Sequence, residues 1–227
     1  MDARVPRRGR PSGRTGTALL AVAREVFLER GFAGTSMDEV AARAKISKSS
    51  LYREHPSKDA LYAAVVTDWA AAGRGAMRPA IDRLVASRDI REGLIEWGGS
   101  LRRSILHPSV VAMRRLVISE APTQPEVAAT YLDESWRANI ATLADALERI
   151  ARDGRLDVPD PAAAAEQLTW LVVGAPLNAV LLESDPDADD VVAAIDVFLA
   201  RYGVSATAPS APPTAQRPDR ASLTADQ

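Results

Sequence analysis

The sequence predicts an all-α protein with a three-helix unit near the N-terminus and a larger helical body after it. Alanine is abundant, strand-like alternation of apolar and polar residues is rare, and no fixed-period repeat occurs. Capping residues and helix-breaking Pro and Gly divide the chain at intervals typical of helices. The 227 residues, 47% of them hydrophobic, are enough for one large or two small domains with a sizeable core.

Three short helices are predicted first. The first spans about residues 17–30 and ends at Gly31, because glycine readily adopts the left-handed conformation that closes a helix. Ser36 and Glu39 form a capping box, which begins the second helix. Ser47 is suited to N-cap the third helix.

Six further helices are predicted in the C-terminal body. Pro56 ends the third helix, Ser57 caps the fourth, and Asp160 with Pro161 makes a favourable start for the penultimate one. A short segment is expected at 80–87. The helices are expected at about 57–77, 90–106, 109–120, 125–153, 161–183 and in a last stretch ending near 202.

The two halves of the chain differ in charge. Residues 1–60 carry a net +5 and residues 61–227 a net −7, which together give the overall −2. A basic front half favours a nucleic-acid partner. Residues 1–16, rich in Arg, Pro, Gly and Ser, are predicted to form a disordered basic arm that either contacts DNA or only aids solubility. Residues 204–227 are predicted to form a disordered tail.

Residues 35–61 predict two short helices joined by a tight turn, followed by the start of another helix. In the second of these helices Leu51 can face the core while small polar and basic groups face outward. Short side chains at a helix N-terminus let the backbone approach base edges in a DNA major groove. We therefore expect a helix-turn-helix DNA-binding domain at 17–62, followed by a second helical domain at 63–203.

The stretch from about Leu19 to Val66 resembles the TetR family of bacterial transcriptional regulators. Two positions depart from the family pattern. Lys45 stands where a turn Gly is usual, so it is expected to adopt a left-handed conformation at some cost. His55 replaces an apolar or aromatic residue and either forms a partly buried ring or loosens that corner. The matching positions are Ala23, Phe27, Arg30-Gly31-Phe32, Thr35-Ser36, Val40-Ala41, Ala44, Ile46-Ser47-Lys48, Leu51-Tyr52 and Pro56-Ser57-Lys58-Asp59-Ala60-Leu61.

The resemblance implies a set of DNA contacts. On the recognition helix, Lys48 and Ser50 are the best candidates to read base edges, with Arg53 close behind. Tyr52 and Lys58 match positions that contact phosphate, the lysine assisted by the N-terminus of its helix. Capping, packing or simple solvation remains the alternative for each position. The candidate DNA-binding residues are Thr35, Ser36, Lys48, Ser49, Ser50, Tyr52, Arg53 and Lys58.

The last two predicted helices have the pattern of an association surface. The helix at 161–183 is apolar over most of its circumference, and the final helix carries an apolar stripe. A twofold four-helix bundle would bury both faces, although a purely intramolecular core is the alternative. The segment 114–120 and the helices after it are similar to the AefR-like C-terminal subgroup, and the family resemblance implies a homodimer on a pseudo-palindromic site. The predicted interface residues are Leu168, Leu171, Val172, Ala175, Ala179, Val191, Ile195, Phe198, Leu199 and Tyr202.

The resemblance also implies that 63–203 is a C-terminal ligand-binding and dimerisation domain, with a small-molecule inducer bound in it. Large aromatic residues with a few polar groups suit a largely apolar ligand, although tryptophans at helical spacing are more often plain core. An acidic inducer could be recognised by one of the arginines at 102, 103, 114 and 115, although solvated or paired roles are favoured. The candidate pocket residues are Trp69, Trp97, Met113, Trp136, Trp170 and Asn178.

Enzymatic activity is not expected. The chain has no cysteine, which excludes disulfides and thiolate chemistry, and its two histidines, His55 and His107, show no metal-ligand spacing. We expect no cofactor and no bound metal. No apolar run reaches the roughly 20 residues that a membrane helix needs, so a cytoplasmic protein without a membrane partner is expected. The sequence thus favours a DNA-binding regulator, in the family's usual mode a repressor, over a helical scaffold dimer without sequence-specific DNA binding.

Overall fold

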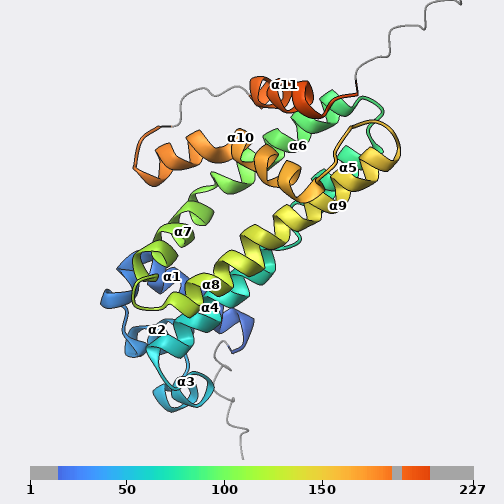
Figure 1. Cartoon of the computed structure of the whole chain (residues 1–227). Helices are drawn as coiled ribbons and strands as arrows, with labels where there is room; N and C mark the ends of the chain where they lie inside the picture. Colours follow the sequence, from blue (N-terminus) through green and yellow to red (C-terminus); the bar gives the residue numbers. More distant parts are fainter. Residues whose placement is uncertain (1–14, 186–190, 205–227) are drawn as a thin grey trace, which may run out of the picture.

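A computed structural model describes residues 15–185 and 191–204, and these residues are almost entirely helical (Figure 1). The predicted arm and tail lie almost wholly outside the described residues. The helices are α1 (Thr17–Gly34), α2 (Met37–Ala44), α3 (Lys48–Glu54), α4 (Lys58–Gly73), α5 (Arg78–Ala86), α6 (Ile90–Ile105), α7 (Pro108–Glu120), α8 (Pro125–Tyr131), the π-helical turn η1 (Leu132–Arg137), α9 (Ala138–Arg152), α10 (Pro161–Leu181) and α11 (Val191–Tyr202).

The elements form an elongated molecule. Helices α1 to α3 lie at one end, α10 and α11 lie with α6 at the other, and α4 with the continuous α8–η1–α9 segment runs between the ends (Figure 1). No strand occurs in the described ranges, where β pairing is limited to an isolated bridge between Leu156 and Gly203. The predicted all-α fold class is therefore confirmed. None of the helices seen here is long and apolar enough to cross a bilayer.

Local capping explains where the helices begin. The hydroxyl of Ser36 accepts a hydrogen bond from the backbone N–H of Glu39 at 3.2 Å, and Ser47 and Ser57 cap α3 and α4 in the same way. The carboxylate of Glu39 pairs with arginines, so only the serine half of the predicted capping box forms. Asp160 caps α10 by accepting from the N–H of Ala163 at 3.0 Å.

Two residues with positive φ shape the N-terminal end. Gly31, with φ of 68°, interrupts α1 at the predicted helix end. Lys45, with φ of 58° and ψ of 39°, adopts the expected left-handed conformation in the turn between α2 and α3. His55 is half-buried, in agreement with the first of its two predicted roles.

The hydrophobic interior forms two clusters of buried side chains. The N-terminal cluster joins α1 to α4 with residues of α7 and α8, and at its centre Tyr62 contacts the rings of Phe27 and Phe32 edge-on at 5.5 and 5.2 Å. The C-terminal cluster joins α5, α6, α9, α10 and α11. Since α4 and parts of α7 and α8 belong to the N-terminal cluster, that core continues well past residue 62.

One long helix was expected at 125–153, and the structure divides it. The six residues of η1 form a π-helical turn between α8 and α9. Such a turn shifts the side chains after it around the helix axis, and π-helical turns are frequent at functional sites. The fourth helix also ends earlier than expected, at Gly73 instead of about residue 77, where Gly73 and Gly75 weaken helix formation.

Candidate nucleic-acid interface and ligand cavity

Helix α3 presents most of the predicted DNA-binding residues on one exposed face. Leu51 is fully buried and anchors α3 against the N-terminal cluster. Lys48, Ser49 and Arg53 are exposed on the other side of the helix, and the side chain of Tyr52 is 47% exposed. This arrangement leaves short and basic side chains free to enter a groove while an apolar residue fixes the helix.

The polar side chains at the start of α3 already have partners within the protein. The ammonium of Lys48 lies 2.5 Å from a carboxylate oxygen of Asp38 in α2. The hydroxyl of Ser47 lies 3.0 Å from that of Ser49 and 2.9 Å from that of Ser50. Binding to DNA would therefore exchange protein contacts for base or phosphate contacts at these residues.

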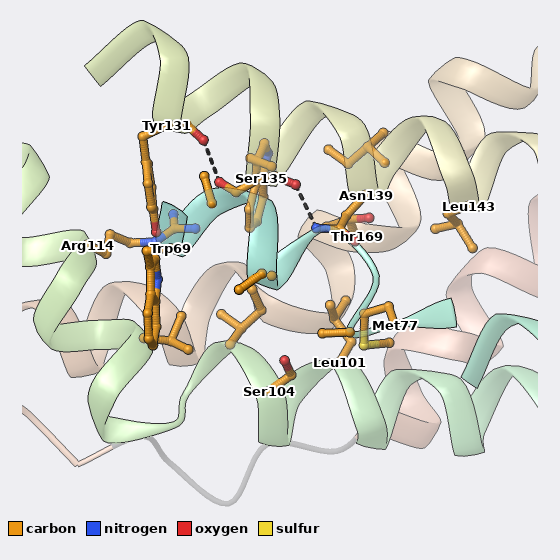
Figure 2. Close-up of a pocket in the computed structure, with 18 of the residues that line it drawn as sticks. Trp69, Met77, Leu101, Ser104, Arg114, Tyr131, Ser135, Asn139, Leu143 and Thr169 are labelled. Atoms are coloured by element: carbon orange, nitrogen blue, oxygen red, sulfur yellow. Dashed lines mark hydrogen bonds between the residues drawn. The ribbon is translucent and has the colours of Figure 1, made fainter. Parts of the chain in front are cut away.

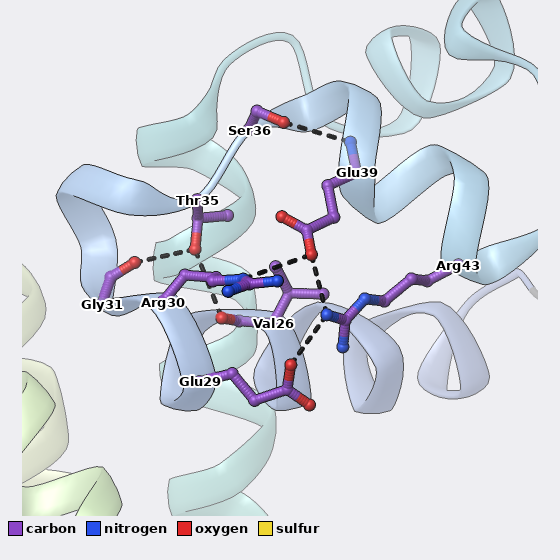
Figure 3. A network of polar contacts seen from close by, with 8 residues as sticks. All are labelled: Val26, Glu29, Arg30, Gly31, Thr35, Ser36, Glu39 and Arg43. Atoms are coloured by element: carbon purple, nitrogen blue, oxygen red, sulfur yellow. Dashed lines mark hydrogen bonds and ion pairs between the residues drawn. The ribbon is translucent and has the colours of Figure 1, made fainter.

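An ionic network fastens α2, and with it the turn to α3, to α1 (Figure 3). Arg43 of α2 pairs with Glu29 of α1 at 2.7 Å and with Glu39 at 2.8 Å, while Arg30 lies 3.5 Å from Glu39. The hydrogen bond from Arg43 lowers the pKa of Glu29 below its ordinary value. Exposed pairs of this kind contribute little to stability because water and salt screen them, so the network orients α2 more than it stabilises the domain.

Two predicted phosphate contacts have structural roles here. Thr35 is only 4% exposed, and its hydroxyl donates to the carbonyl of Gly31 at 2.8 Å, which favours a structural role over the predicted phosphate contact. Lys58 donates to the carbonyl of Phe32 at 2.8 Å and lies 4.5 Å from the centre of the Phe32 ring, so it joins α4 to the end of α1. Ser36 is exposed and caps α2.

A cavity of about 270 Å³ lies between the two clusters (Figure 2). Its walls come from every helix between α4 and α10, with η1 among them. Three of the predicted pocket residues, Trp69, Trp97 and Trp136, line it. Its volume is just below the ~300–1,000 Å³ typical of drug-sized ligands, so it suits a small molecule.

The other three predicted pocket residues lie elsewhere. Met113 is fully buried in the N-terminal cluster. Trp170 is 46% exposed and packs on the outer side of Trp136, with ring centres 5.1 Å apart. Asn178 is exposed on α10. The rotation of each helix about its axis decides which side chains face the cavity, and the apolar pattern of the sequence does not fix that rotation.

The cavity contains a polar stripe that the sequence analysis missed. Tyr131, Ser135 and Asn139 are four residues apart, so they share one helical face in spite of the π-helical turn. The hydroxyl of Ser135 donates to the carbonyl of Tyr131 at 2.5 Å, and the amide of Asn139 donates to the carbonyl of Ser135 at 2.6 Å (Figure 2). This regular spacing was the available signal. Ser104 and Thr169 also line the cavity.

Arg114 gives the cavity its charge. Its guanidinium carbon lies 4.8 Å from the centre of the Trp136 ring. The Nε atom is buried without a hydrogen-bond partner, as is the indole Nε1 of Trp97. Both residues line the cavity. The cavity can therefore offer unsatisfied donors to a bound molecule.

The predicted dimer interface is partly buried inside its own subunit. Leu168, Val172, Ile195, Phe198 and Tyr202 belong to the C-terminal cluster, so they are not available to a second chain as predicted. The outer faces of α10 and α11 carry exposed apolar side chains, and Leu171 and Ala175 among them belong to the predicted set. The exposed ones are Trp170, Leu171, Ala175, Leu182 and Val197, which we call the outer stripe.

Within residues 15–185 and 191–204, no group of three or more His, Cys, Asp and Glu side chains could bind a metal ion. The two histidines lie in separate places, His55 after α3 and His107 at the N-cap of α7, where its ring contacts Ser109.

Comparison with known proteins identifies the family. Residues 19–65 match the family described as bacterial regulatory proteins of the tetR family, and residues 92–204 match the C-terminal domain of AefR-like transcriptional repressors. The chain belongs to the TetR family of transcriptional regulators, and its family and fold are those of regulators, not of enzymes.

Individual relatives cover parts of the chain. The transcriptional activator FasR of Mycolicibacterium smegmatis is 35% identical over 115 residues, which are 49% of each chain. The transcriptional repressor Rv3405c of Mycobacterium tuberculosis is 40% identical over 62 residues, 26% of this chain and 33% of the relative. The matched segments therefore span half or less of these relatives.

Solved structures match over most of the chain. A TetR-family regulator from Mesorhizobium loti superimposes with a TM-score of 0.77 at 23% identity, over 82% of this chain and 95% of that one, and it shows the shared fold. The flavonoid-responsive regulator FrrA superimposes with a TM-score of 0.66 at 28% identity, over 82% and 95% of the two chains.

Proposed function

We propose that this regulator is a homodimeric repressor that binds a pseudo-palindromic DNA operator through α3 and releases it when a small molecule binds in the cavity. The observation that carries the proposal is the exposed face of α3, where Lys48, Tyr52 and Arg53 are presented by a helix anchored on buried Leu51. Half-buried Ser50 lies at the N-terminal end of the same helix. The cytoplasm, where bacterial DNA lies, is the proposed place of action.

The contacts to DNA are proposed to divide into two kinds. Lys48 and Ser50 at the N-terminal end of α3 read base edges, with Arg53 beside them, because only this end can enter a groove deeply. Tyr52 contacts phosphate, which positions the domain without reading sequence. Lys58 serves the same purpose only if its ammonium leaves the carbonyl of Phe32.

The outer stripe is the proposed dimer surface. TetR-family regulators act as dimers, and Trp170, Leu171 and Leu182 are large apolar side chains that are 46%, 40% and 70% exposed. An adjacent cluster of exposed apolar residues is typical of a surface that meets a partner. A twofold axis through α10 and α11 would place two α3 helices on one side of the dimer for two half-sites.

Helix α4 is the proposed link between the cavity and α3. Its first half packs in the N-terminal cluster through Leu61 and Val65, and its second half lines the cavity through Trp69 and Gly73. The guanidinium of Arg24 in α1 lies 4.6 Å from the centre of the Trp69 ring. A ligand that moves Trp69 therefore acts on the helix pair that supports α2 and α3.

Release follows from differential binding. A ligand that prefers a spacing of the two α3 helices unsuited to the operator lowers DNA affinity by its preference for that state. The name of FrrA, a flavonoid-responsive regulator, supports a small and largely apolar inducer. Activation is the second candidate, favoured by the name of FasR, an activator that shares 35% identity over half of the chain.

Selection of DNA from a random pool tests the proposal. The purified protein is incubated with the pool at about 0.15 M salt, where nonspecific phosphate binding is weak, and the bound DNA is sequenced after several rounds. We expect an enriched inverted repeat. Leu171→Glu places a charge in the outer stripe, and for this variant we expect a single half-site or weaker enrichment. A folded wild-type dimer that enriches no sequence would contradict the proposal.

A further inference from the structure

The ligand cavity has one charged end and one apolar end. In Figure 2 Arg114 lies beside Trp69 and Tyr131 at one end, and Met77, Leu101 and Leu143 lie at the other. Ser135 and Asn139 lie between the two ends. A bound molecule of matching shape would carry a polar head group on an apolar body.

The charge at the polar end is unbalanced. Among the described residues that line the cavity, only Arg114 carries a charge. No acidic side chain among these described residues lines the cavity to balance it. No hydrogen bond or ion pair to another described residue engages its guanidinium, which rests on the Trp136 ring.

The neighbouring residue shows what an arginine does here when a partner is available. Arg115 donates to the carbonyl of Val180 and lies 3.6 Å from the carboxylate of Glu183. Arg114, one position earlier on α7, faces the cavity instead. A buried donor without a partner costs free energy, and an anion bound in the cavity would remove that cost.

We propose that the cavity binds a small amphipathic monocarboxylate, whose carboxylate pairs with Arg114 and whose apolar body extends toward Met77, Leu101 and Leu143. The carboxylate matches the planar guanidinium in shape, and its single charge balances the single charge of the site. A cationic ligand would meet an unpaired like charge. The indole N–H of Trp97 can donate to a further acceptor on the ligand. This inference rests on the proposed function in taking the cavity as the inducer site.

Matched pairs of acids and amides test the inference. Calorimetric titration compares octanoate, 4-phenylbutyrate and 2-naphthoate with their primary amides, which have nearly the same shape but no charge. Hydrogen bonds to charged groups contribute about 1.5–3 kcal/mol, so at least one acid should bind roughly 10- to 100-fold more tightly than its amide. Equal affinities for every acid and its amide, or no binding of any acid, would overturn the inference.

Two arginine variants test whether Arg114 causes the preference for the acid over its amide. Arg114→Met keeps an apolar stem on Trp136 but removes the charge, so the preference for the acid should disappear while amide affinity changes less than about twofold. Arg103→Met is the control, because Arg103 is exposed on α6 and does not line the cavity. The Arg103→Met variant should retain the full preference for the acid over its amide. If Arg114→Met does not fold, Arg114→Lys keeps the charge but not the planar pairing and should lower the preference in part.

The operator selection and the acid–amide titrations test the proposed function and the carboxylate inference separately. Operator selection uses the protein without ligand, so an enriched repeat combined with equal acid and amide affinities overturns only the carboxylate inference. An acid that binds through Arg114 but leaves operator affinity unchanged supports the inference and contradicts the role of the cavity as inducer site. A preference for acids that survives in Arg114→Met would overturn the assignment of Arg114.

Discussion

Lys45 closes the turn between α2 and α3 in a conformation that costs a residue with a side chain about 1–2 kcal/mol. Its backbone N–H bonds to the carbonyls of Ala41 and Ala42, which is the usual end of a helix at a left-handed residue. The turn sets the angle between the two helices, so the conformation is required by the fold whichever residue occupies it.

Lys45→Gly is therefore expected to raise the free energy of unfolding by about 1 kcal/mol, since glycine adopts positive φ without a steric cost. Urea denaturation measures the change. Lys45→Ala removes the same charge and chain length but keeps Cβ, so it should give little or no gain. Equal stabilisation by both substitutions would show that φ is not the cause.

Tyr62 is a buried phenol at the centre of the N-terminal cluster. Burial, with a smaller effect from the charge of Glu120, raises the pKa of Tyr62 to about 12. In the unfolded chain the phenol ionises near pH 10. The contribution of Tyr62 to stability is thus complete below about pH 10 and is lost as the pH rises toward 12.

Tyr62→Phe is expected to reduce the loss of unfolding free energy between pH 10 and 12, because phenylalanine cannot ionise. Urea denaturation at several pH values measures it, and absorbance at 295 nm follows the remaining tyrosinates. Tyr52→Phe, at an exposed position, serves as the control and should leave the pH dependence unchanged. Identical pH profiles for Tyr62→Phe and the wild type would contradict the assignment.

Tyr52 provides the residue-level test of the DNA interface. Because its side chain is exposed and not part of either cluster, Tyr52→Ala should leave the unfolding free energy within about 0.5 kcal/mol of the wild type. Loss of a hydrogen bond to a charged phosphate should weaken operator binding roughly tenfold or more. Fluorescence anisotropy measures the affinity. Intact affinity in the folded variant would exclude the phosphate contact.

At the scale of the helices, the ion pair between Lys48 and Asp38 connects the start of α3 to the first turn of α2. Asp38 is exposed and lies on the side of the domain proposed to face DNA. Its carboxylate competes with phosphate for Lys48 and repels phosphate as well. The pair thus favours the DNA-free state over the bound state.

Asp38→Asn should strengthen DNA binding by about 1 kcal/mol, or roughly fivefold, because it removes both the competition and the repulsion. This gain in DNA affinity should decrease as the salt concentration rises, because salt screens the charges. Asp82→Asn makes the same charge change on exposed α5 and should have little effect on affinity. A loss of affinity in Asp38→Asn would mean that Asp38 positions Lys48 for DNA.

The positions of the helices in the sequence were predictable from local rules, but the rotation of each helix about its own axis was not. The caps at Ser36, Ser47 and Ser57 form with backbone N–H groups three residues away, so the sequence alone indicates them. The π-helical turn at 132–137 changes the phase of α9 relative to α8. On α10, which is apolar over most of its circumference, the sequence does not fix the rotation about the helix axis, so Trp170 was expected in the pocket, although the structure places it on the outer face.

At the scale of the whole molecule, the cavity lies where the two hydrophobic clusters meet. Its walls combine α4, which belongs to the N-terminal cluster, with α9 and α10, which belong to the C-terminal cluster. The ion pair between Arg74 and Glu134 adds a link between the end of α4 and η1. A small ligand in this position can contact both ends of the molecule at once.

This arrangement could be predicted only in outline. The apolar character of the helix at 161–183 was correctly recognised, but several of its apolar residues, such as Leu168 and Val172, pack inside the subunit. A fully apolar helix does not reveal which face meets its own body and which meets a partner. Only the packing against α6, α9 and α11 separates the outer stripe from the core.

The reading of DNA sequence by α3 underlies the proposed function of the whole molecule. Its most direct test is the affinity of the protein for the selected inverted repeat and for a scrambled duplex of the same composition, measured by fluorescence anisotropy at about 0.15 M salt. We predict that the repeat binds at least about 1,000-fold more tightly, as is typical of sequence-specific DNA-binding proteins. Affinities within about tenfold of each other would mean that the basic face binds phosphate alone and would contradict the claim.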